Sequence, residues 1–258
     1  MLYQFGRLVD EVKPHIVSME NVPELENEKV FSDFVGTLTR LGYNVTYKVV
    51  NAADYGVPQR RKRLLLLASK KKKISFIQPT HQQPVTVREA IGNLPPIGAG
   101  ENNAIDRLHI TSSLSALNLQ RIQHSMPGGS WHDWPDNLVL NCHKKEKGHT
   151  YTSVYGRMCW EDVAPTITTQ FTGYGTGRFG HPEQDRALTL REGAIIQTFP
   201  EDYSFLPPNE KIIIKDVSRQ IGNAVPPRLG EIIGLSILKH YQKRKYVKKN
   251  DANKLAGE

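Results

Sequence analysis

The sequence predicts an α/β protein, and three observations lead to that fold class. The first quarter of the chain alternates apolar patterns of helical and of strand spacing. A middle stretch rich in proline and glycine then interrupts this alternation. Near the carboxyl terminus, an apolar helical pattern returns and can cover a face of the first domain. The 258 residues are enough to bury one large core or two smaller ones.

The first elements are expected in the order helix, strand, helix, strand, strand. Residues 3–12 carry apolar side chains at helical spacing, and residues 16–19 form a short apolar run. A run with little alternation is typical of a strand covered on both faces, the usual state in a parallel sheet. Residues 30–41 predict a second helix, while residues 45–50 and 63–68 predict two strands. This order is half of an α/β domain.

The first strands of a doubly wound sheet are not recognisable. No glycine-rich turn of the dinucleotide-binding kind follows a strand near the amino terminus. The later glycines of residues 173–177 lack that context, so we predict a flexible loop there. We therefore expect an incomplete doubly wound, Rossmann-like sheet. One strand edge would be left uncovered, which favours association with another chain.

Residues from about 70 to 187 predict a loop-rich second domain of mixed, short elements, including a strand over residues 163–170. Its mixture of aromatic and basic residues suits a nucleic-acid groove and an ordinary small core equally well. Residues 187–199 then predict a helix, and Pro226 and Pro227 mark the start of a long terminal helix.

Charge and composition indicate a polyanionic partner and a reducing compartment. The net charge is +8, and eight basic residues without an acidic one lie between Arg60 and Lys73. This cluster brackets an apolar strand, which makes it the better nucleic-acid candidate. A second basic concentration, from Lys239 to Lys254, predicts a solvated helix end or disorder. Two cysteines exclude a disulfide framework, and no apolar run could span a bilayer. Without a signal peptide pattern, a cytoplasmic protein is expected.

Glu20 and Asn21 directly follow the first predicted strand. In open α/β sheets, ligands bind at the carboxyl ends of the strands. A carboxylate at that edge is a candidate acid, base or base-reading group. The alternative is that Glu20 caps the next helix, since Asn27 and Glu28 precede its apolar pattern.

Several blocks of residues, in this order, resemble the later blocks of the cytosine-5 DNA methyltransferases. The resemblance extends from about Leu2 to Tyr241. Its blocks are Glu20–Val22, Gln59–Arg63, Arg186–Glu192 with Gln197–Pro200, and Gly222–Pro227. Two further stretches, Tyr155–Met158 and Pro165–Thr169, are similar to the recognition-domain border of some bacterial members.

The resemblance implies a reaction on a cytosine that the enzyme flips out of double-stranded DNA. A cysteine thiolate adds to ring carbon 6, so that carbon 5 can take a methyl group from S-adenosylmethionine. Glu20 matches the glutamate that holds the base at ring nitrogen 3 and the exocyclic amine. Its carboxyl group would stabilise the charge that builds up there.

Further roles follow from the same resemblance. Arg63 would contact the flipped base, because its rigid donor fork pairs with carbonyl and phosphate oxygens. Arg61 would position or brace the backbone, and Asn21 would fix the neighbouring loop. The remaining predicted site residues bind cofactor or DNA: Asn223, Ala224 and Val225 help to close the methyl-donor pocket, and Gln59, Arg60, Arg157 and Arg178 contact DNA.

The resemblance also suggests a domain division. Residues 1–78 would form half of the catalytic α/β domain, and residues 79–185 the target-recognition domain. Residues 186–245 would be a return segment and a terminal helix that packs on the catalytic domain. Residues 246–258 would be a basic tail without order.

Two family elements are not found in this sequence. These are the proline-cysteine loop that carries the nucleophile and the phenylalanine- and glycine-rich turn that receives the methyl donor. Cys142 and Cys159 do not follow a proline. His143 lies beside Cys142, but no further cysteines provide the spacing of metal ligands, so no metal site is predicted.

Three interpretations remain open. The chain can be the carboxy-terminal part of a methyltransferase, inactive alone and completed by a second polypeptide. It can be a truncated, inactive fragment, or a sequence-selective DNA-binding module without catalysis. Each places the chain in a bacterial cytoplasm or nucleoid, with no membrane and no metal.

Overall fold

The computed structural model describes residues 1–255, without the side chains of residues 146, 149 and 243–255. The chain divides into two compact units. The sheet unit comprises Met1–Tyr55, Lys62–Gln82 and the segment from Arg228 onward. The loop-rich unit comprises Gly56–Arg61 and Gln83–Pro227. Each unit is described by itself.

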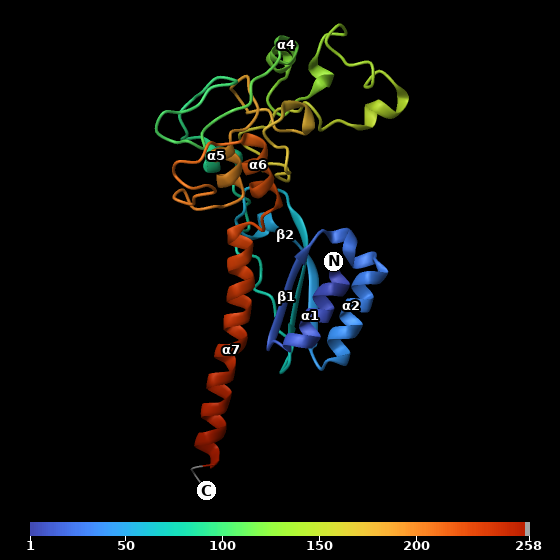
Figure 1. The fold of residues 1–258 in the computed structure, drawn as a ribbon, viewed down its shortest axis with the longest axis vertical. Coiled ribbons are helices and arrows are strands. Elements are labelled where there is room, and N and C mark those ends of the chain that lie inside the picture. The colour runs from blue at the N-terminus through green and yellow to red at the C-terminus, as the bar shows by residue number, and fades with distance from the viewer. Residues whose placement is uncertain (256–258) are drawn as a thin grey trace. The chain divides into compact units, whose positions relative to one another are not determined.

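The sheet unit contains three strands and three α-helices in the described residues (Figure 1). Their bounds are α1 Leu2–Val12, β1 Ile16–Asn21, α2 Lys29–Arg40, β2 Asn44–Asn51, β3 Lys62–Ser69 and α7 Pro227–Leu255. Short 3-10 helices, Pro23–Asn27 and Ala52–Tyr55, follow β1 and β2. The predicted elements of this part of the chain are therefore present.

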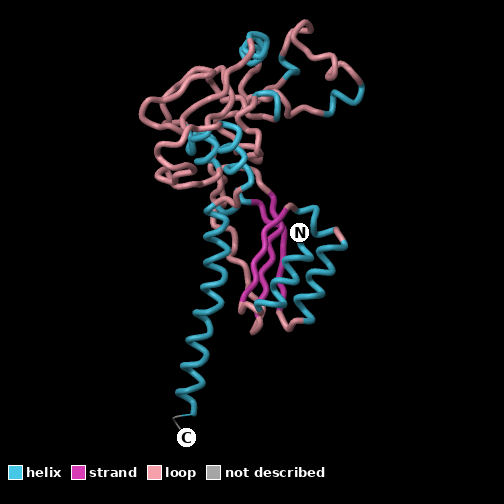
Figure 2. The backbone as a smooth tube through the Cα atoms, viewed as in Figure 1, coloured by secondary structure: helices cyan, strands magenta, loops and turns pink. Residues whose placement is uncertain are grey.

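The three strands form one sheet in the order β1-β3-β2 (Figure 2). β3 pairs antiparallel with both neighbours, placing Ile16 and Asn44 opposite Ser69. The expectation of parallel pairing is therefore wrong for the described strands. An apolar run signals burial on both faces but says nothing of strand direction, which explains the error. β1 lies at an edge of this sheet.

The strand buried on both faces is β3 rather than β1. Leu64, Leu66 and Ala68 pack with α1 and α2, which lie on one face of the sheet (Figure 1). Leu65 and Leu67 pack on the other face with Leu229 and Ile232 of α7. Each fully buried leucine contributes roughly 1.5–3 kcal/mol, so β3 anchors the unit.

Helix α7 continues to Leu255, through most of the segment 246–258 for which we predicted no order. Residues 256–258 lie outside the described residues.

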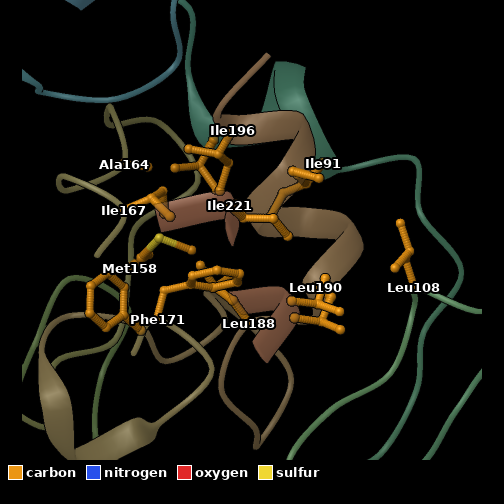
Figure 3. Packing of buried hydrophobic residues seen from close by; sticks show 14 residues of the cluster. Ile91, Leu108, Met158, Ala164, Ile167, Phe171, Leu188, Leu190, Ile196 and Ile221 are labelled. Carbon is orange, nitrogen blue, oxygen red and sulfur yellow. The ribbon is translucent and has the colours of Figure 1, made fainter. Parts of the chain in front are cut away.

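The loop-rich unit contains four short α-helices in its described residues, and loops make up most of it (Figure 2). They are α3 Val87–Ile91, α4 Ala116–His124, α5 Leu190–Ile196 and α6 Ile214–Asn223, with 3-10 turns at Trp131–Asp133, Glu146–Thr150 and Tyr174–Thr176. The last turn lies in the predicted glycine loop, and its Tyr174 is buried. Figure 3 shows how Met158, Ile167 and Phe171 from loops pack with Ile91, Leu190 and Ile221 from three helices.

Two predicted elements of this unit differ from the structure. Residues 163–170 form only an isolated bridge to Gln59, because side chains take up their backbone groups. Gln59 accepts from the Ile167 N–H at 3.1 Å, and Ser218 donates to the Thr169 carbonyl at 3.0 Å. The helix predicted from residue 187 begins at Leu190, because Ala187 and Leu188 hydrogen-bond as extended backbone beside Phe179 and Gly180.

Candidate functional site

The end of β1 presents Glu20 to Arg63 of β3. Glu20 lies opposite Leu65 in the antiparallel register, and Arg63 is two residues earlier, on the same face of the sheet. Arg63 Nε is 2.8 Å from Glu20 Oε1, and the two side chains are only 14% and 18% exposed. Within the described residues, the buried Glu20 Oε1 accepts no hydrogen bond. Oε1 faces the arginine and is shielded from solvent, so only the remaining part of this carboxylate, which is 18% exposed in all, can face a ligand.

Asn21 and Glu20 do not cap the following helix. The side chain of Asn21 accepts the Val22 N–H at 2.8 Å, which fixes the turn after β1. Glu28 is the cap residue of α2, and Glu20 lies inside β1. The capping interpretation of Glu20 is thus wrong.

Arg61 lies two residues before Arg63 in a different environment. It is 3% exposed and donates to the Ile167 carbonyl at 2.9 Å. It also donates to the carbonyls of Gly222 and Ala224, at 3.2 and 3.3 Å. Arg61 therefore hydrogen-bonds to both the Pro165–Thr169 stretch and the Gly222–Pro227 block, which are distant along the chain.

Gln59 joins the same network. It is fully buried and donates to the Ile196 carbonyl at 3.1 Å and to Gln197 Oε1 at 2.8 Å. Gln197 in turn donates to the Ile221 carbonyl at 2.7 Å. Gln197 lies in one of the blocks that resemble the family, but the sequence does not predict it as a site residue. The sequence gives no sign that Gln197 contacts Gln59, since the two residues are 138 positions apart.

The predicted cofactor residues form the junction between α6 and α7. Asn223 ends α6, and Ala224 and Val225 lead to the start of α7. Asn223 and Val225 are exposed and Ala224 is half-buried. A Cβ added to Gly222 would lie 2.4 Å from the Thr168 backbone, so the close approach of these segments requires glycine.

The three further arginines predicted to contact DNA differ in exposure. Arg60 is exposed and pairs with Asp162. Arg157 is 4% exposed, pairs with Asp185 at 2.5 Å and donates to the Ile122 carbonyl at 2.7 Å. Arg178 is half-buried and donates to the Gly129 carbonyl at 2.6 Å. Two of the three thus hold loops of their own unit.

The basic cluster between Arg60 and Lys73 does not form one surface. Lys62 and Arg63 begin β3, whereas Lys70–Lys73 follow its other end. Six strand residues, 64–69, separate Arg63 from Lys70, a span of about 23 Å. Lys70 is also engaged, because it donates to the Leu41 carbonyl at 2.7 Å and lies 4.4 Å from the Tyr43 ring centroid.

A buried ion pair that the sequence did not predict lies at α5. Arg186 and Glu192 are both fully buried and form two hydrogen bonds, of 2.7 and 2.8 Å. Burial alone would raise the pKa of Glu192, but the hydrogen bonds and charge of Arg186 hold that pKa below its ordinary value. The capping-box pattern of Thr189 and Glu192 is a sequence signal for the start of α5, but it does not indicate the ion pair.

His181 lies beside this pair, with its Nε2 at 3.7 Å from Glu192 Oε1. Burial lowers the pKa of His181 to about 4, and the charge of Glu192 opposes that shift. Its Nδ1 accepts the backbone N–H groups of Glu183 and Gln184, at 3.2 and 2.9 Å. The ring is therefore neutral near pH 7 and serves as an acceptor.

The cysteines are free thiols, with Cys142 exposed and Cys159 half-buried. Among the described residues, no three potential ligands are grouped so that they could hold a metal ion. Likewise, residues 1–255 include no helix with both the length and the hydropathy needed to cross a bilayer.

Comparison with known proteins decides the family. The C-5 cytosine-specific DNA methylase family matches residues 1–239. The chain belongs to this family of DNA-modifying enzymes. The family predicted from the sequence blocks is therefore confirmed, and its methyl donor is S-adenosylmethionine.

Several curated proteins are similar to the chain. The Type II methylase M.HgiDII of Herpetosiphon aurantiacus is 53% identical over 92% of this chain and 68% of its own length. The Type II methyltransferase M1.HphI of Haemophilus parahaemolyticus is 36% identical over 92% of this chain and 60% of its own. The chain thus spans about two thirds of the length of these bacterial relatives.

Solved structures support the fold. A DNA modification methyltransferase encoded within an E. coli prophage matches with a TM-score of 0.65 at 21% identity, covering 91% of this chain and 72% of its own. Spodoptera frugiperda DNMT2 matches with a TM-score of 0.58 at 19% identity, covering 92% and 70%. Both indicate an α/β methyltransferase fold.

Proposed function

We propose that this chain forms the base-holding and target-recognition part of a DNA (cytosine-5) methyltransferase. The whole enzyme would transfer a methyl group from S-adenosylmethionine to carbon 5 of a flipped cytosine in duplex DNA. The observation that supports this most directly is the Glu20–Arg63 pair, in which the arginine holds one carboxylate oxygen while the glutamate side chain stays 18% exposed.

Glu20 suits the hydrogen-bonding edge of cytosine. Its carboxylate can accept from the exocyclic amine and, when it shares a proton, stabilise charge at ring nitrogen 3. Arg63 holds that carboxylate from one side through Nε, while its Nη1 donates to the Lys62 carbonyl at 2.7 Å. The arginine is thus fixed in place, and its fork lies beside the proposed base site.

The predicted DNA-contacting residues divide into two roles. Arg60 is exposed and remains the proposed DNA contact of its block. We assign bracing to Gln59, Arg61 and Arg157, because each is buried and hydrogen-bonded to carbonyl groups of its own unit. Arg178 would brace the loop at Gly129 while remaining partly accessible to a phosphate.

The methyl donor supplies the electrophilic methyl group when bound. Asn223, Ala224 and Val225 fit one wall of its pocket, since an exposed amide and two small apolar side chains are held in place by the Arg61–Ala224 hydrogen bond. Asn223 would bind a polar edge of the donor, and Val225 would exclude water from it.

The proposed chemistry requires a thiolate from a proline-cysteine loop. Cys142 and Cys159 lie in the loop-rich unit and do not follow a proline, so we assign them no nucleophilic role. The loop would come from additional sequence of the same protein or from a second polypeptide. Alone, these 258 residues would bind DNA without methylating it.

The test combines the chain with a polypeptide that carries the family's proline-cysteine loop and methyl-donor turn. Transfer of labelled methyl groups to duplex DNA is expected from the mixture and not from either part. The matched control replaces the loop cysteine with serine, which should abolish transfer. No transfer from two folded, associated parts would contradict the proposal, and selective DNA binding without transfer would favour the binding-module alternative.

A further inference from the structure

A cleft in the loop-rich unit has a chemistry that the proposed base site does not explain. It encloses about 550 Å³ and is lined by residues from four segments of the unit. Those that matter here are Arg88, Gln123, Trp160, Glu183 and Asp185. Arginine donors and carboxylate acceptors therefore face the same space.

Arg88 and Trp160 are held rigidly against each other. The Arg88 N–H donates to the Trp160 carbonyl at 3.0 Å, and the Val87 N–H donates to the Asp162 carbonyl at 2.8 Å. The Arg88 guanidinium lies 5.2 Å from the Trp160 ring centroid. Trp160 is itself packed edge-on against His181, with ring centroids 5.0 Å apart. The arginine thus lies on a fixed aromatic platform.

Glu161 orients the guanidinium without using all of its donors. Both Nε and Nη2 of Arg88 lie 2.6 Å from Glu161 Oε1. An arginine carries five N–H donors, so its Nη1 group and the outer hydrogen of Nη2 remain directed away from Glu161. The side chains of this ion pair are 55% and 68% exposed, so the pair adds little stability. The main effect of Glu161 is therefore to orient the Arg88 guanidinium.

The opposite charges in the cleft decide which part of DNA fits. Glu183 and Asp185 would repel a phosphate group, although Arg157 pairs with Asp185 and reduces its effect. An oriented arginine fork instead matches the O6 and N7 acceptors of guanine, and a carboxylate accepts from the N4 amine of cytosine. The cleft combines both features, which are those of a G·C pair read in the major groove.

We propose that Arg88 is a specificity-determining residue that reads a guanine of the target sequence, with Trp160 and Glu161 as its positioning residues. The proposal rests on the proposed function, which makes duplex DNA the substrate. Glu183, exposed on the cleft, provides the acceptor for the paired cytosine.

The test selects bound sequences from a library of randomised duplexes with the full 258-residue chain. Arg88→Lys keeps the charge but loses the planar fork. This variant is expected to lower the preference for guanine at one position by about 5- to 150-fold, with the other positions unchanged. Arg219→Lys is the matched control, since Arg219 is an exposed arginine paired with Asp216 outside the cleft. It should select the wild-type sequence.

Two outcomes would contradict the role proposed for Arg88 without contradicting the proposed function of the chain. One is a wild-type chain that selects a sequence and an Arg88→Lys variant that selects it equally well. The other is binding that weakens uniformly over all sequences with a smaller salt dependence, which identifies a phosphate contact. A wild-type chain that enriches no sequence would contradict both this assignment and the recognition role proposed above. Unfolding midpoints of the variants verify that each remains folded.

Discussion

Each unit of the molecule contains an arginine–glutamate pair that is shielded on both sides, and these two pairs differ in what their glutamate still offers. In the loop-rich unit, Glu192 is fully buried, and its oxygens accept from Arg186 and from the Thr189 N–H. In the sheet unit, Glu20 is 18% exposed, and Arg63 Nε lies 2.8 Å from one of its oxygens, Oε1.

The comparison separates structural from functional carboxylates. A buried pair with all its acceptors used leaves nothing for a ligand, and removing one partner exposes the other to the full cost of an unpaired charge. A carboxylate that is paired through one oxygen and stays partly exposed can still accept from a ligand. We therefore expect changes at Glu192 to affect stability and changes at Glu20 to affect chemistry.

The largest expected effect is that of Glu192→Ala. This substitution leaves the Arg186 charge buried and unpaired, and should lower the free energy of unfolding by about 3–5 kcal/mol. Denaturant titration followed by tryptophan fluorescence measures the change. Glu231→Ala is the control, because Glu231 is 54% exposed in its pair with Arg228 and should cost at most about 1 kcal/mol. Equal losses of unfolding free energy in the two variants would show that the burial of Glu192 does not determine its contribution to stability.

The next effect concerns pH and the histidine beside the buried pair. His181 has a pKa of about 4 in the folded protein, against about 6.5 when unfolded. Between these values the unfolded chain binds a proton that the folded chain does not, so stability falls as pH decreases from about 6.5 to about 4. The total loss is about 3 kcal/mol.

His181→Asn tests this pH dependence, because asparagine can keep an acceptor for the Glu183 and Gln184 N–H groups but does not titrate. Unfolding free energies at pH 7 and pH 4.5 should differ less in the variant than in the wild type. The lowered pKa of Glu192 adds a further loss below about pH 4.5 in both proteins. Parallel stability curves would show that His181 does not cause the loss.

A smaller effect is expected at Gly222, where the terminal block meets the loop at Thr168. Gly222→Ala places a Cβ 2.4 Å from the Thr168 backbone and should destabilise the protein by about 1–3 kcal/mol. Gly234→Ala in α7 meets no atom within 4 Å and should stabilise it by about 0.4–1 kcal/mol. Thermal unfolding of the two variants provides the measurement. A stable Gly222→Ala variant would mean that the junction is less closely packed than described.

Much of the sheet unit could be predicted from sequence, because its helices and strands carry regular apolar patterns. The helical periodicity of residues 3–12 and 30–41 predicted α1 and α2, and the three apolar runs predicted the three strands. Strand direction could not be predicted, since burial on both faces is common to parallel strands and to a central antiparallel strand such as β3.

The loop-rich unit was less predictable because side chains rather than regular backbone pairing hold it together. Helix α6 was not predicted, although Ile214, Val217 and Ile221 form an apolar face at helical spacing. Gln59, Arg61 and Gln197 fix segments more than 100 positions apart, a relation that periodicity does not encode. For the site, family blocks indicated Glu20 and Arg63, and geometry added their ion pair and its partial exposure.

The central claim is that Glu20 is retained for chemistry and Glu192 for structure. The most direct measurement compares Glu20→Gln with Glu192→Gln in the enzyme completed by the proline-cysteine part, recording both unfolding midpoint and labelled methyl transfer. We predict that Glu20→Gln lowers the transfer rate by about 100-fold or more and costs less stability than Glu192→Gln, because the Glu20–Arg63 pair is less buried. Full transfer activity in Glu20→Gln, or a loss that only follows its unfolding, would contradict the claim.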